Sequence, residues 1–300
     1  MSFIVNEIRK RFAESDEKRD AGLSTPEDIQ RFDDIAYGDN PVWQRLDVYR
    51  PKLEKGKKLP VIVSVHGGGW VYGDKERYQF YCMSLAQRGF AVVNFTYRLA
   101  PEFKFPAALE DTNLVFQWIF QNQEEYGLDV ERIFAVGDSA GGNLLALYTA
   151  FCVNPAYAEH FSFQPPKQNL LKGIALNCAA ALENPKEEKL VQELVQDDAS
   201  EEMLEMLGVT RWITPQFPPV FLMTCTGDFL IKDANQIAQA LLKNVVPFEF
   251  HYYGDHLRKL GHVFHCNIRL EEAQQCNDDT CRFFRMLCEK ADGEYKKHEV

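Results

Sequence analysis

The chain has 300 residues, a formal net charge of −11 at pH 7, 46% hydrophobic residues and 26% charged residues. This balance is that of a soluble globular protein, and it excludes a disordered or fibrous chain. Because binding to phosphate backbones or anionic lipid relies on clustered Lys and Arg, the acidic charge argues against nucleic acid and membranes as partners.

The sequence gives no sign of membrane insertion or secretion. No apolar run approaches the roughly 18 residues that a membrane-spanning helix needs. The opening segment MSFIVNEIRKRF has too short an apolar stretch for a secretion signal, so we expect a cytoplasmic protein. The eight cysteines are scattered without a CxxC pair, which indicates buried free thiols rather than a zinc or redox site.

In chain order, the first forty residues show no strand pattern, although Ile4, Ile8 and Phe12 fall on one helical face. Residues 45–49 alternate apolar and polar side chains, as an antiparallel strand entering a sheet from one edge does. From about Pro60 onward, short apolar β-branched runs alternate with amphipathic segments, which predicts a mostly parallel sheet covered by helices. The expected parallel strands are residues 61–65, 91–95, 133–136, 173–177, 220–224 and 248–253, and the expected helices include 107–125, 141–152 and 233–243.

Two stretches interrupt this alternation: the N-terminal segment 1–44 and the acidic, helix-prone residues 183–213. For each, an excursion that covers a pocket and a surface helix packed for stability alone are about equally supported. We expect an N-terminal cap segment of residues 1–44 and a main domain of residues 45–300, with a second cap insertion at about 183–213.

The strongest motif is Gly-Asp-Ser-Ala-Gly-Gly at residues 137–142, directly after one expected strand and before an expected helix. A nucleophile on a sharp strand-to-helix turn needs small neighbours, and glycines two residues before and two after Ser139 provide that space. The helix that follows points its positive end at the same place, which favours an oxyanion. The motif therefore predicts Ser139 as a nucleophile.

A second motif, His-Gly-Gly-Gly-Trp at residues 66–70, follows the expected strand 61–65. A carbonyl that becomes a tetrahedral oxyanion needs preorganised N–H donors, and glycines let the main chain approach closely enough to supply them. The expected oxyanion donors are the amides of Gly67, Gly68 and Ala140.

These two motifs, together with Tyr-Arg-Leu-Ala-Pro at residues 97–101 and Phe-Pro-Ala-Ala-Leu-Glu-Asp at 105–111, make the chain resemble a known family. It is similar to the hormone-sensitive-lipase branch of the α/β-hydrolases, a large group of bacterial carboxylesterases, over roughly residues 45–290. The resemblance implies an α/β-hydrolase fold: a mostly parallel eight-stranded sheet flanked by helices, with a small helical cap. It also implies structural roles for Tyr97, Arg98 and Asp111, because these linking residues are not catalytic in the family.

The acid that orients the catalytic histidine must follow the serine in the chain. Asp228 lies just beyond the expected strand 220–224. The family's Asp-Pro-Leu-x-Asp run appears here as Asp-Phe-Leu-Ile-Lys-Asp, without the proline and with one extra residue, which leaves Asp233 as an alternative. We favour Asp228 because it is closer to the strand, whereas Asp233 is expected to be the N-cap of a helix that starts at residue 234.

The histidine follows the strand 248–253, where the family's His-Gly-Phe appears as His-Val-Phe at residues 262–264. His262 is therefore the expected general base, with His256 and His265 as competitors. The histidines and acids of this region match no zinc-binding spacing, so we expect no metal, and the chemistry needs no cofactor.

These assignments predict a serine carboxylesterase that cleaves a small-molecule ester through an acyl-enzyme intermediate. The preference for short acyl chains comes from the resemblance. An amidase or formamidase would use the same triad of Ser139, Asp228 and His262. The alternative from another class is a non-catalytic small-molecule-binding protein on a hydrolase scaffold, although such proteins typically lack one triad residue. The family contains monomers and dimers, so a homodimer stays open.

Overall fold

The computed structural model of the protein describes residues 2–52, 57–166, 171–196 and 198–298. Within these residues, eight strands form one sheet in the order β1-β2-β4-β3-β5-β6-β7-β8. The pairs β1–β2 and β2–β4 are antiparallel and the remaining pairs are parallel, so the expected mostly parallel eight-stranded sheet is confirmed. The strands are β1 (Ile29–Ala36), β2 (Arg45–Pro51), β3 (Leu59–Val65), β4 (Ala91–Phe95), β5 (Leu128–Asp138), β6 (Leu171–Asn177), β7 (Val220–Cys225) and β8 (Phe248–Tyr253).

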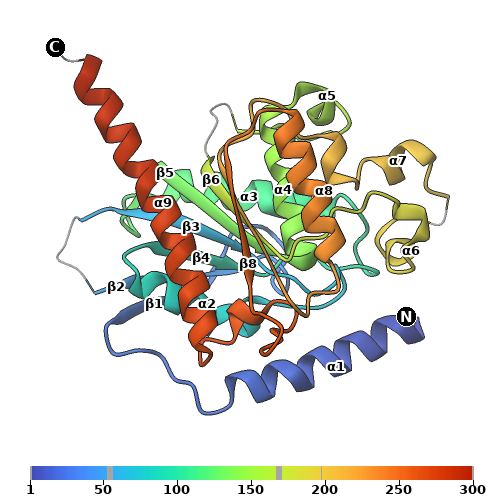
Figure 1. Ribbon diagram of the computed structural model, residues 1–300, viewed down its shortest axis with the longest axis horizontal. Coiled ribbons are helices and arrows are strands. Elements are labelled where there is room, and N and C mark those ends of the chain that lie inside the picture. Colours follow the sequence, from blue (N-terminus) through green and yellow to red (C-terminus); the bar gives the residue numbers. More distant parts are fainter. Residues whose placement is uncertain (1, 53–56, 167–170, 197, 299–300) are drawn as a thin grey trace.

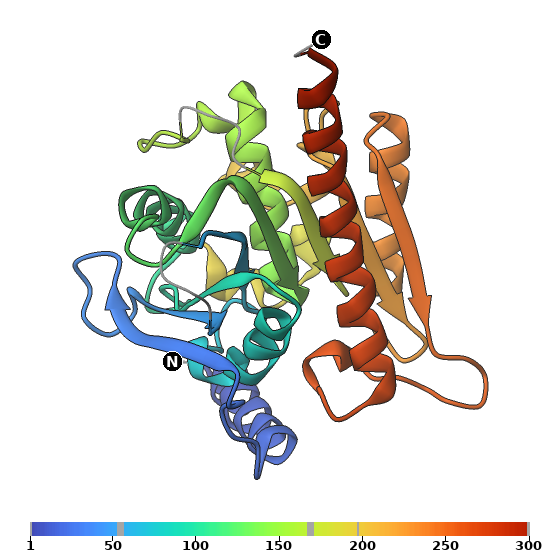
Figure 2. The same cartoon turned by 90° about the vertical axis from the view of Figure 1, so that its left-hand side faces the viewer.

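Helices cover both faces of the twisted sheet (Figures 1 and 2). The buried strands carry apolar side chains on both faces: in β3, Val61, Val63 and Val65 belong to one core and Ile62 to the other. Helices α3, α4 and α8 pack on the first core, and α2 and α9 on the second. The α-helices are α1 (Phe3–Asp20), α2 (Lys75–Gln87), α3 (Ala107–Asn122), α4 (Ser139–Val153), α5 (Pro155–Ala158), α6 (Val191–Leu194), α7 (Glu201–Glu205), α8 (Ile231–Lys243) and α9 (Glu271–His298). None of the helices in the described ranges is long and apolar enough to cross a bilayer.

The expected parallel strands are all present, and most are longer than predicted. The strand expected at 133–136 covers Leu128–Asp138, and the helix expected from residue 141 begins at Ser139. Residues 45–49 lie in β2 and pair antiparallel as expected, but one strand in from the edge. Helices α2 and α9 and strand β1 were not predicted from the sequence.

The expected boundary at residue 44 is wrong, because the N-terminal segment divides into a helix and a strand of the sheet. Strand β1 pairs with β2 at the sheet's edge, so residues 29–36 belong to the main domain. Its outer position leaves most of its side chains at least partly exposed, and its polar residues hide the alternation by which a strand is recognised.

Helix α1 lies across the edge of the sheet where the parallel strands end. Arg9 donates from Nε to the Val71 carbonyl at 2.7 Å, and Tyr72 donates its hydroxyl proton to Asp16 at 2.8 Å, so the helix packs on the loop after β3. At its other end, the guanidinium of Arg269 donates to the carbonyl oxygens of Arg19 and Ala21, in the last turn and at the C-cap of the helix, and links it to the loop before α9. The helix thus spans two loops that leave carboxyl ends of strands.

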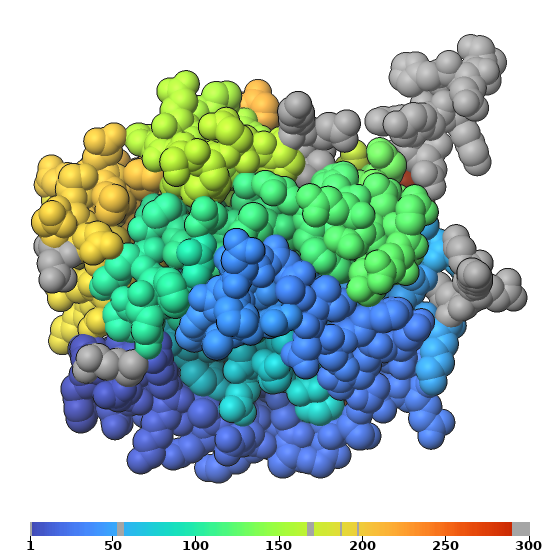
Figure 3. All heavy atoms as spheres, turned by 180° about the vertical axis from the view of Figure 1, so that it is seen from behind, coloured from blue at the N-terminus to red at the C-terminus, as the bar shows by residue number. Residues whose placement is uncertain are grey.

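Residues 183–213 form short helical turns, among them α6 and α7, on the same side of the molecule as the start of α1 (Figures 1 and 3). Several hydrogen bonds attach this insertion to the domain, two of them close to the beginning of α4. The amide of Phe105 donates to the Leu194 carbonyl at 2.8 Å, and the side chain of Asn143 in α4 donates to the Leu207 carbonyl at 3.1 Å. The insertion is therefore held over the beginning of α4.

Candidate active site

Ser139 lies where β5 ends and α4 begins, on the strand-to-helix turn that the sequence predicts. Its φ of +52° is in the left-handed region, which a serine adopts only at an energetic cost. Glycine makes this turn possible, since a Cβ on Gly141 would lie 2.2 Å from the Val65 carbonyl oxygen. The turn leaves the Ser139 residue half-buried, with part of its surface open to solvent.

The carboxylate of Asp228, in the turn after β7, accepts three hydrogen bonds. Its Oδ1 accepts from Nδ1 of His262 at 2.7 Å and from the Leu230 amide at 2.9 Å, and its Oδ2 accepts from the Thr224 hydroxyl at 2.7 Å. Burial alone would raise the pKa of this carboxyl, but the hydrogen bonds outweigh burial and lower the pKa to about 2. Asp228 is therefore ionised at neutral pH, and it keeps a proton on Nδ1 of His262 and leaves Nε2 free to accept one.

Asp233, the alternative acid, binds a backbone amide instead of a histidine. Helix α8 begins at Ile231 rather than at residue 234, so Asp233 lies in its first turn and is not the expected N-cap. Its Oδ2 accepts from the amide of Ala181 at 2.8 Å, which ties α8 to the chain leaving β6. The structure therefore pairs His262 with Asp228.

The two competing histidines have other surroundings. His256 is exposed. His265 is fully buried, with its ring edge-on to Tyr81 and its Nε2 3.5 Å from the sulfur of Cys266, and burial lowers its pKa to about 3. Such an imidazole is neutral, and it packs against Tyr81 and Cys266 of the second core.

Ser139 and His262 both lie in segments that follow the carboxyl ends of parallel strands, β5 and β8. No hydrogen bond between their side chains is present among the described residues. The end of β6 joins them. The Ala180 amide donates to the Ser139 carbonyl at 3.0 Å, and the Cys178 sulfur lies within 4.8 Å of ligand atoms of both Asp228 and His262. The three candidate triad residues thus come from three strand ends that meet at one place.

Asp138, the residue before the serine, is buried beside this site. Burial raises the pKa of its carboxyl to about 6, while the hydroxyl of Tyr78 and the charge of His262 act in the opposite direction. The hydroxyl donates to Oδ2 of Asp138 at 2.8 Å. The electrostatic effect of His262 on Asp138 is a further sign that the histidine loop lies next to the serine turn.

The expected oxyanion donors need one correction. The Gly67 amide is buried and donates to the Tyr78 hydroxyl at 2.9 Å, so it is not open to a substrate. Gly68 and Gly69 are only half-buried, and no hydrogen bond from either amide is present among the described residues. The Ala140 amide is in the first turn of α4, where helical amides have no partner within the helix. The amides that remain without a partner in the described part of the chain are therefore those of Gly68, Gly69 and Ala140. The sequence did not predict the hydrogen bond between the Gly67 amide and the Tyr78 hydroxyl.

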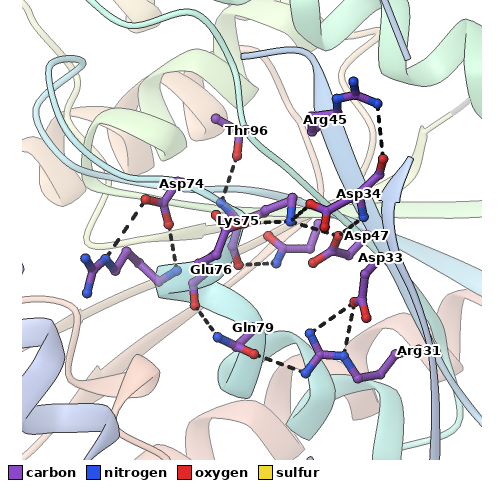
Figure 4. Close-up of polar contacts among 12 residues, drawn as sticks. Arg31, Asp33, Asp34, Arg45, Asp47, Asp74, Lys75, Glu76, Gln79 and Thr96 are labelled. Atoms are coloured by element: carbon purple, nitrogen blue, oxygen red, sulfur yellow. Dashed lines mark hydrogen bonds and ion pairs between the residues drawn. The ribbon is translucent and has the colours of Figure 1, made fainter. Parts of the chain in front are cut away.

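The far end of this glycine loop is anchored by the buried side chain of Lys75 (Figure 4). Its Nζ lies 2.8 Å from Asp34, 3.0 Å from Asp47 and 2.6 Å from Glu76. Burial would lower the pKa of this ammonium, but the three carboxylates outweigh that effect and raise it, so Lys75 stays charged. The ion pairs fix the point at which the loop enters α2.

The structure gives the linking residues the structural roles that the resemblance implies. Tyr97 stacks on His66 with ring centroids 4.0 Å apart and donates its hydroxyl proton to the His66 carbonyl at 2.7 Å. Arg98 binds the fully buried Asp111 through Nε at 2.9 Å and Nη2 at 2.7 Å. These contacts hold the start of the glycine loop and the loop after β4.

Two groups of side chains with metal-binding atoms occur in the described part of the chain: Cys178 with Asp228 and His262, and Asp138 with His265 and Cys266. In each group the carboxylate already accepts protein hydrogen bonds, from His262 and Thr224 in the first and from Tyr78 in the second. We therefore assign no metal to either group.

The sheet order, the strained serine after β5 and the acid–histidine pair after β7 and β8 define the class of the protein as an α/β-hydrolase. Comparison with known proteins agrees: residues 62–266 match the alpha/beta hydrolase fold family, and the chain belongs to this family.

Among curated proteins, the chain is 28% identical over 231 residues to versiconal hemiacetal acetate esterase of Dothistroma septosporum, covering 69% of this chain and 67% of the relative. It is 40% identical over 118 residues to arylacetamide deacetylase of Bos taurus, covering 38% of this chain and 29% of that protein. It is 41% identical over 101 residues to carboxylesterase NlhH of Mycobacterium tuberculosis, covering 33% and 31%. The chain thus spans less than a third of the length of the last two relatives.

Solved structures resemble the whole chain. Esterase B from Lactobacillus rhamnosis superposes with a TM-score of 0.87 at 24% identity, covering 97% of this chain and 96% of that one. A hyperthermophilic esterase from Pyrobaculum calidifontis superposes with a TM-score of 0.73 at 26% identity, covering 95% and 94%. The first likeness supports the fold alone because of its low identity.

Proposed function

We propose that the protein is a serine carboxylesterase that hydrolyses short-chain acyl esters, with Ser139 as nucleophile, His262 as general base and Asp228 as the acid that orients it. The observation that carries this proposal is the 2.7 Å hydrogen bond between His262 and Asp228 at the sheet edge that also bears the strained Ser139. Versiconal hemiacetal acetate esterase and carboxylesterase NlhH, two of the relatives, are esterases by name.

In the proposed reaction, Oγ of Ser139 attacks the ester carbonyl carbon while its proton moves to Nε2 of His262. The carbonyl oxygen becomes an oxyanion and accepts hydrogen bonds from the amides of Gly68, Gly69 and Ala140. His262 then gives its proton to the departing alkoxide, which leaves as an alcohol. A water molecule, deprotonated by the same imidazole, attacks the acyl-enzyme and releases the carboxylic acid and the free serine.

Two segments that pack on the glycine loop and the loop after β3 support the proposed preference for small substrates. Residues 183–213 lie over the glycine loop, since Leu190 of this insertion is 3.2 Å from the position that a Cβ on Gly69 would take. Helix α1 closes a second side through its contacts with the loop after β3. We propose that these two segments form the cap and limit the length of the acyl chain.

The test is turnover of p-nitrophenyl acetate, butyrate and decanoate by the wild type and by Ser139→Ala. We expect the variant to lose at least a thousandfold of kcat/KM while its thermal unfolding midpoint and far-ultraviolet circular dichroism stay unchanged. The wild type should prefer acetate or butyrate to decanoate. Full activity in Ser139→Ala would refute the assignment of the nucleophile.

Amide hydrolysis is a second candidate, because arylacetamide deacetylase is among the relatives. The same triad would serve, with His262 protonating an amine in place of an alkoxide. Comparison of kcat/KM for phenyl acetate and acetanilide separates the two activities, and we expect the ester to be much the better substrate.

We also propose a cytoplasmic location. All eight cysteines are free and seven of them are buried, as suits a reducing compartment. Fractionation of cells that express the protein without a tag tests this location, and recovery outside the cytoplasm would contradict it.

A further inference from the structure

Phe229 places an exposed aromatic ring against the imidazole of His262. The two ring centroids are 4.2 Å apart with planes tilted by 43°, and Phe229 is 73% exposed. Exposed apolar side chains are common on protein surfaces when they are scattered singly. This one differs because it touches the candidate general base.

The ring is presented by a fixed turn. Asp228, on one side of Phe229 in the chain, accepts the amide of Leu230, on the other side, at 2.9 Å. Leu230 packs against the larger hydrophobic core, and the Asp228 carboxylate is also held by Thr224 and His262. The backbone at Phe229 is therefore anchored on both sides while its side chain faces solvent.

The chemistry of ester cleavage specifies which part of a substrate comes near this ring. His262 must give a proton to the alkoxide oxygen, so that oxygen has to come within roughly 2.6–3.2 Å of Nε2. The first carbons of the alcohol group then lie within a few ångströms of the imidazole, and hence beside a ring packed on that imidazole. The acyl group extends instead from the carbonyl carbon held at the Gly68, Gly69 and Ala140 amides.

We propose that Phe229 forms a wall of the subsite for the alcohol group and selects esters whose alcohol carries an aryl ring or a similar flat apolar group. The proposal rests on the proposed function, because His262 defines the alcohol side. An aryl group packed on Phe229 covers apolar surface that water now contacts. Aromatic pairs contribute roughly a twofold to twelvefold change in an equilibrium or rate ratio.

The experiment compares kcat/KM for benzyl acetate and ethyl acetate. The two esters share the acyl group, and their alcohols have similar acidity, so the intrinsic chemistry is closely matched. The proteins are the full-length wild type, Phe229→Ala, Phe229→Leu and the control Leu257→Ala. Leu257 is 83% exposed in the loop that precedes His262, so this control truncates a neighbouring exposed apolar side chain.

We expect Phe229→Ala to lower the ratio of the two kcat/KM values, benzyl over ethyl, by about fivefold to tenfold. Phe229→Leu should lower it less, and Leu257→Ala should leave it within about twofold. An unchanged ratio in Phe229→Ala, with or without an equal loss on both esters, overturns the proposal, because the ring would then act only through His262 or not at all.

A second pair of substrates, ethyl phenylacetate and ethyl acetate, tests the acyl side. We expect Phe229→Ala to leave this ratio within about twofold, and a larger change here than with the benzyl pair would place Phe229 on the acyl side and refute the proposal. Failure of the proposed function looks different, because the wild type would then hydrolyse none of these esters.

Discussion

Replacing Tyr78 by Phe removes one hydroxyl that joins the glycine loop to the residue before the nucleophile. The hydroxyl accepts from the Gly67 amide at 2.9 Å and donates to Asp138 at 2.8 Å, and all three residues are buried. A buried amide left without a partner costs about 1–3 kcal/mol, and a hydrogen bond to a charged group contributes about 1.5–3 kcal/mol. We therefore expect Tyr78→Phe to lose about 3–5 kcal/mol of unfolding free energy at pH 8.

The loss should be smaller at low pH. The pKa of Asp138 is already about 6 because of burial, and the Tyr78 hydroxyl counteracts the rise, so the variant raises this pKa further. At pH 5 the carboxyl is mostly protonated in both proteins, and the variant then loses only bonds between neutral groups. Urea denaturation at pH 5 and pH 8 measures both values. An unfolding free energy of the variant within about 0.5 kcal/mol of the wild-type value at both pH values would contradict this prediction.

Three further predictions concern individual charges. Asp228→Asn should lower kcat by about 10³–10⁴-fold through loss of the His262 tautomer, whereas Asp233→Asn should change it less than about fivefold; the opposite order would make Asp233 the triad acid. The unfolding free energy of Asp138→Asn should rise by up to about 3 kcal/mol relative to that of the wild type as pH increases from about 4 to 7. The reason is that the pKa of the wild-type carboxyl is about 6 in the folded protein and about 3.8 in the unfolded chain, so that ionisation destabilises only the wild type. A difference in unfolding free energy that does not change with pH in urea denaturation would contradict this. Lys75→Met should lose about 3–5 kcal/mol of unfolding free energy because it strands the buried Asp47 carboxylate, and a loss below 1 kcal/mol would mean that the ion pairs contribute little.

The parts of the fold that could be predicted are those with strong local patterns. Most of the parallel strands contain short apolar runs buried on both faces, and glycines at fixed spacing mark the turn at Ser139. Helix α2 has a helical pattern in the sequence, because Asp74 caps it and Tyr78, Tyr81, Cys82 and Leu85 follow at helical spacing, all buried. Strand β1 had no such signal because it is an exposed edge strand.

The details of the site depend on contacts between distant segments. Asp228 and Asp233 are five positions apart in the sequence. In the folded chain Asp228 binds His262, whereas Asp233 accepts from the Ala181 amide. Likewise, the position of Gly67 in a glycine-rich loop does not reveal that its amide already donates to the Tyr78 hydroxyl. Local patterns therefore predict the kind of chemistry and favour Asp228, while the partners of Asp233 and of the Gly67 amide come from distant segments that the sequence does not reveal.

The central claim is that Ser139 is a nucleophile activated by His262. The most direct measurement is mass spectrometry after treatment with a p-nitrophenyl alkylphosphonate, with peptide mapping of the adduct. We predict one phosphonyl group per chain, attached to the peptide that contains Ser139, with the rate of labelling greatly reduced in His262→Ala. Labelling at another residue, or no labelling of the folded wild type, would contradict the account.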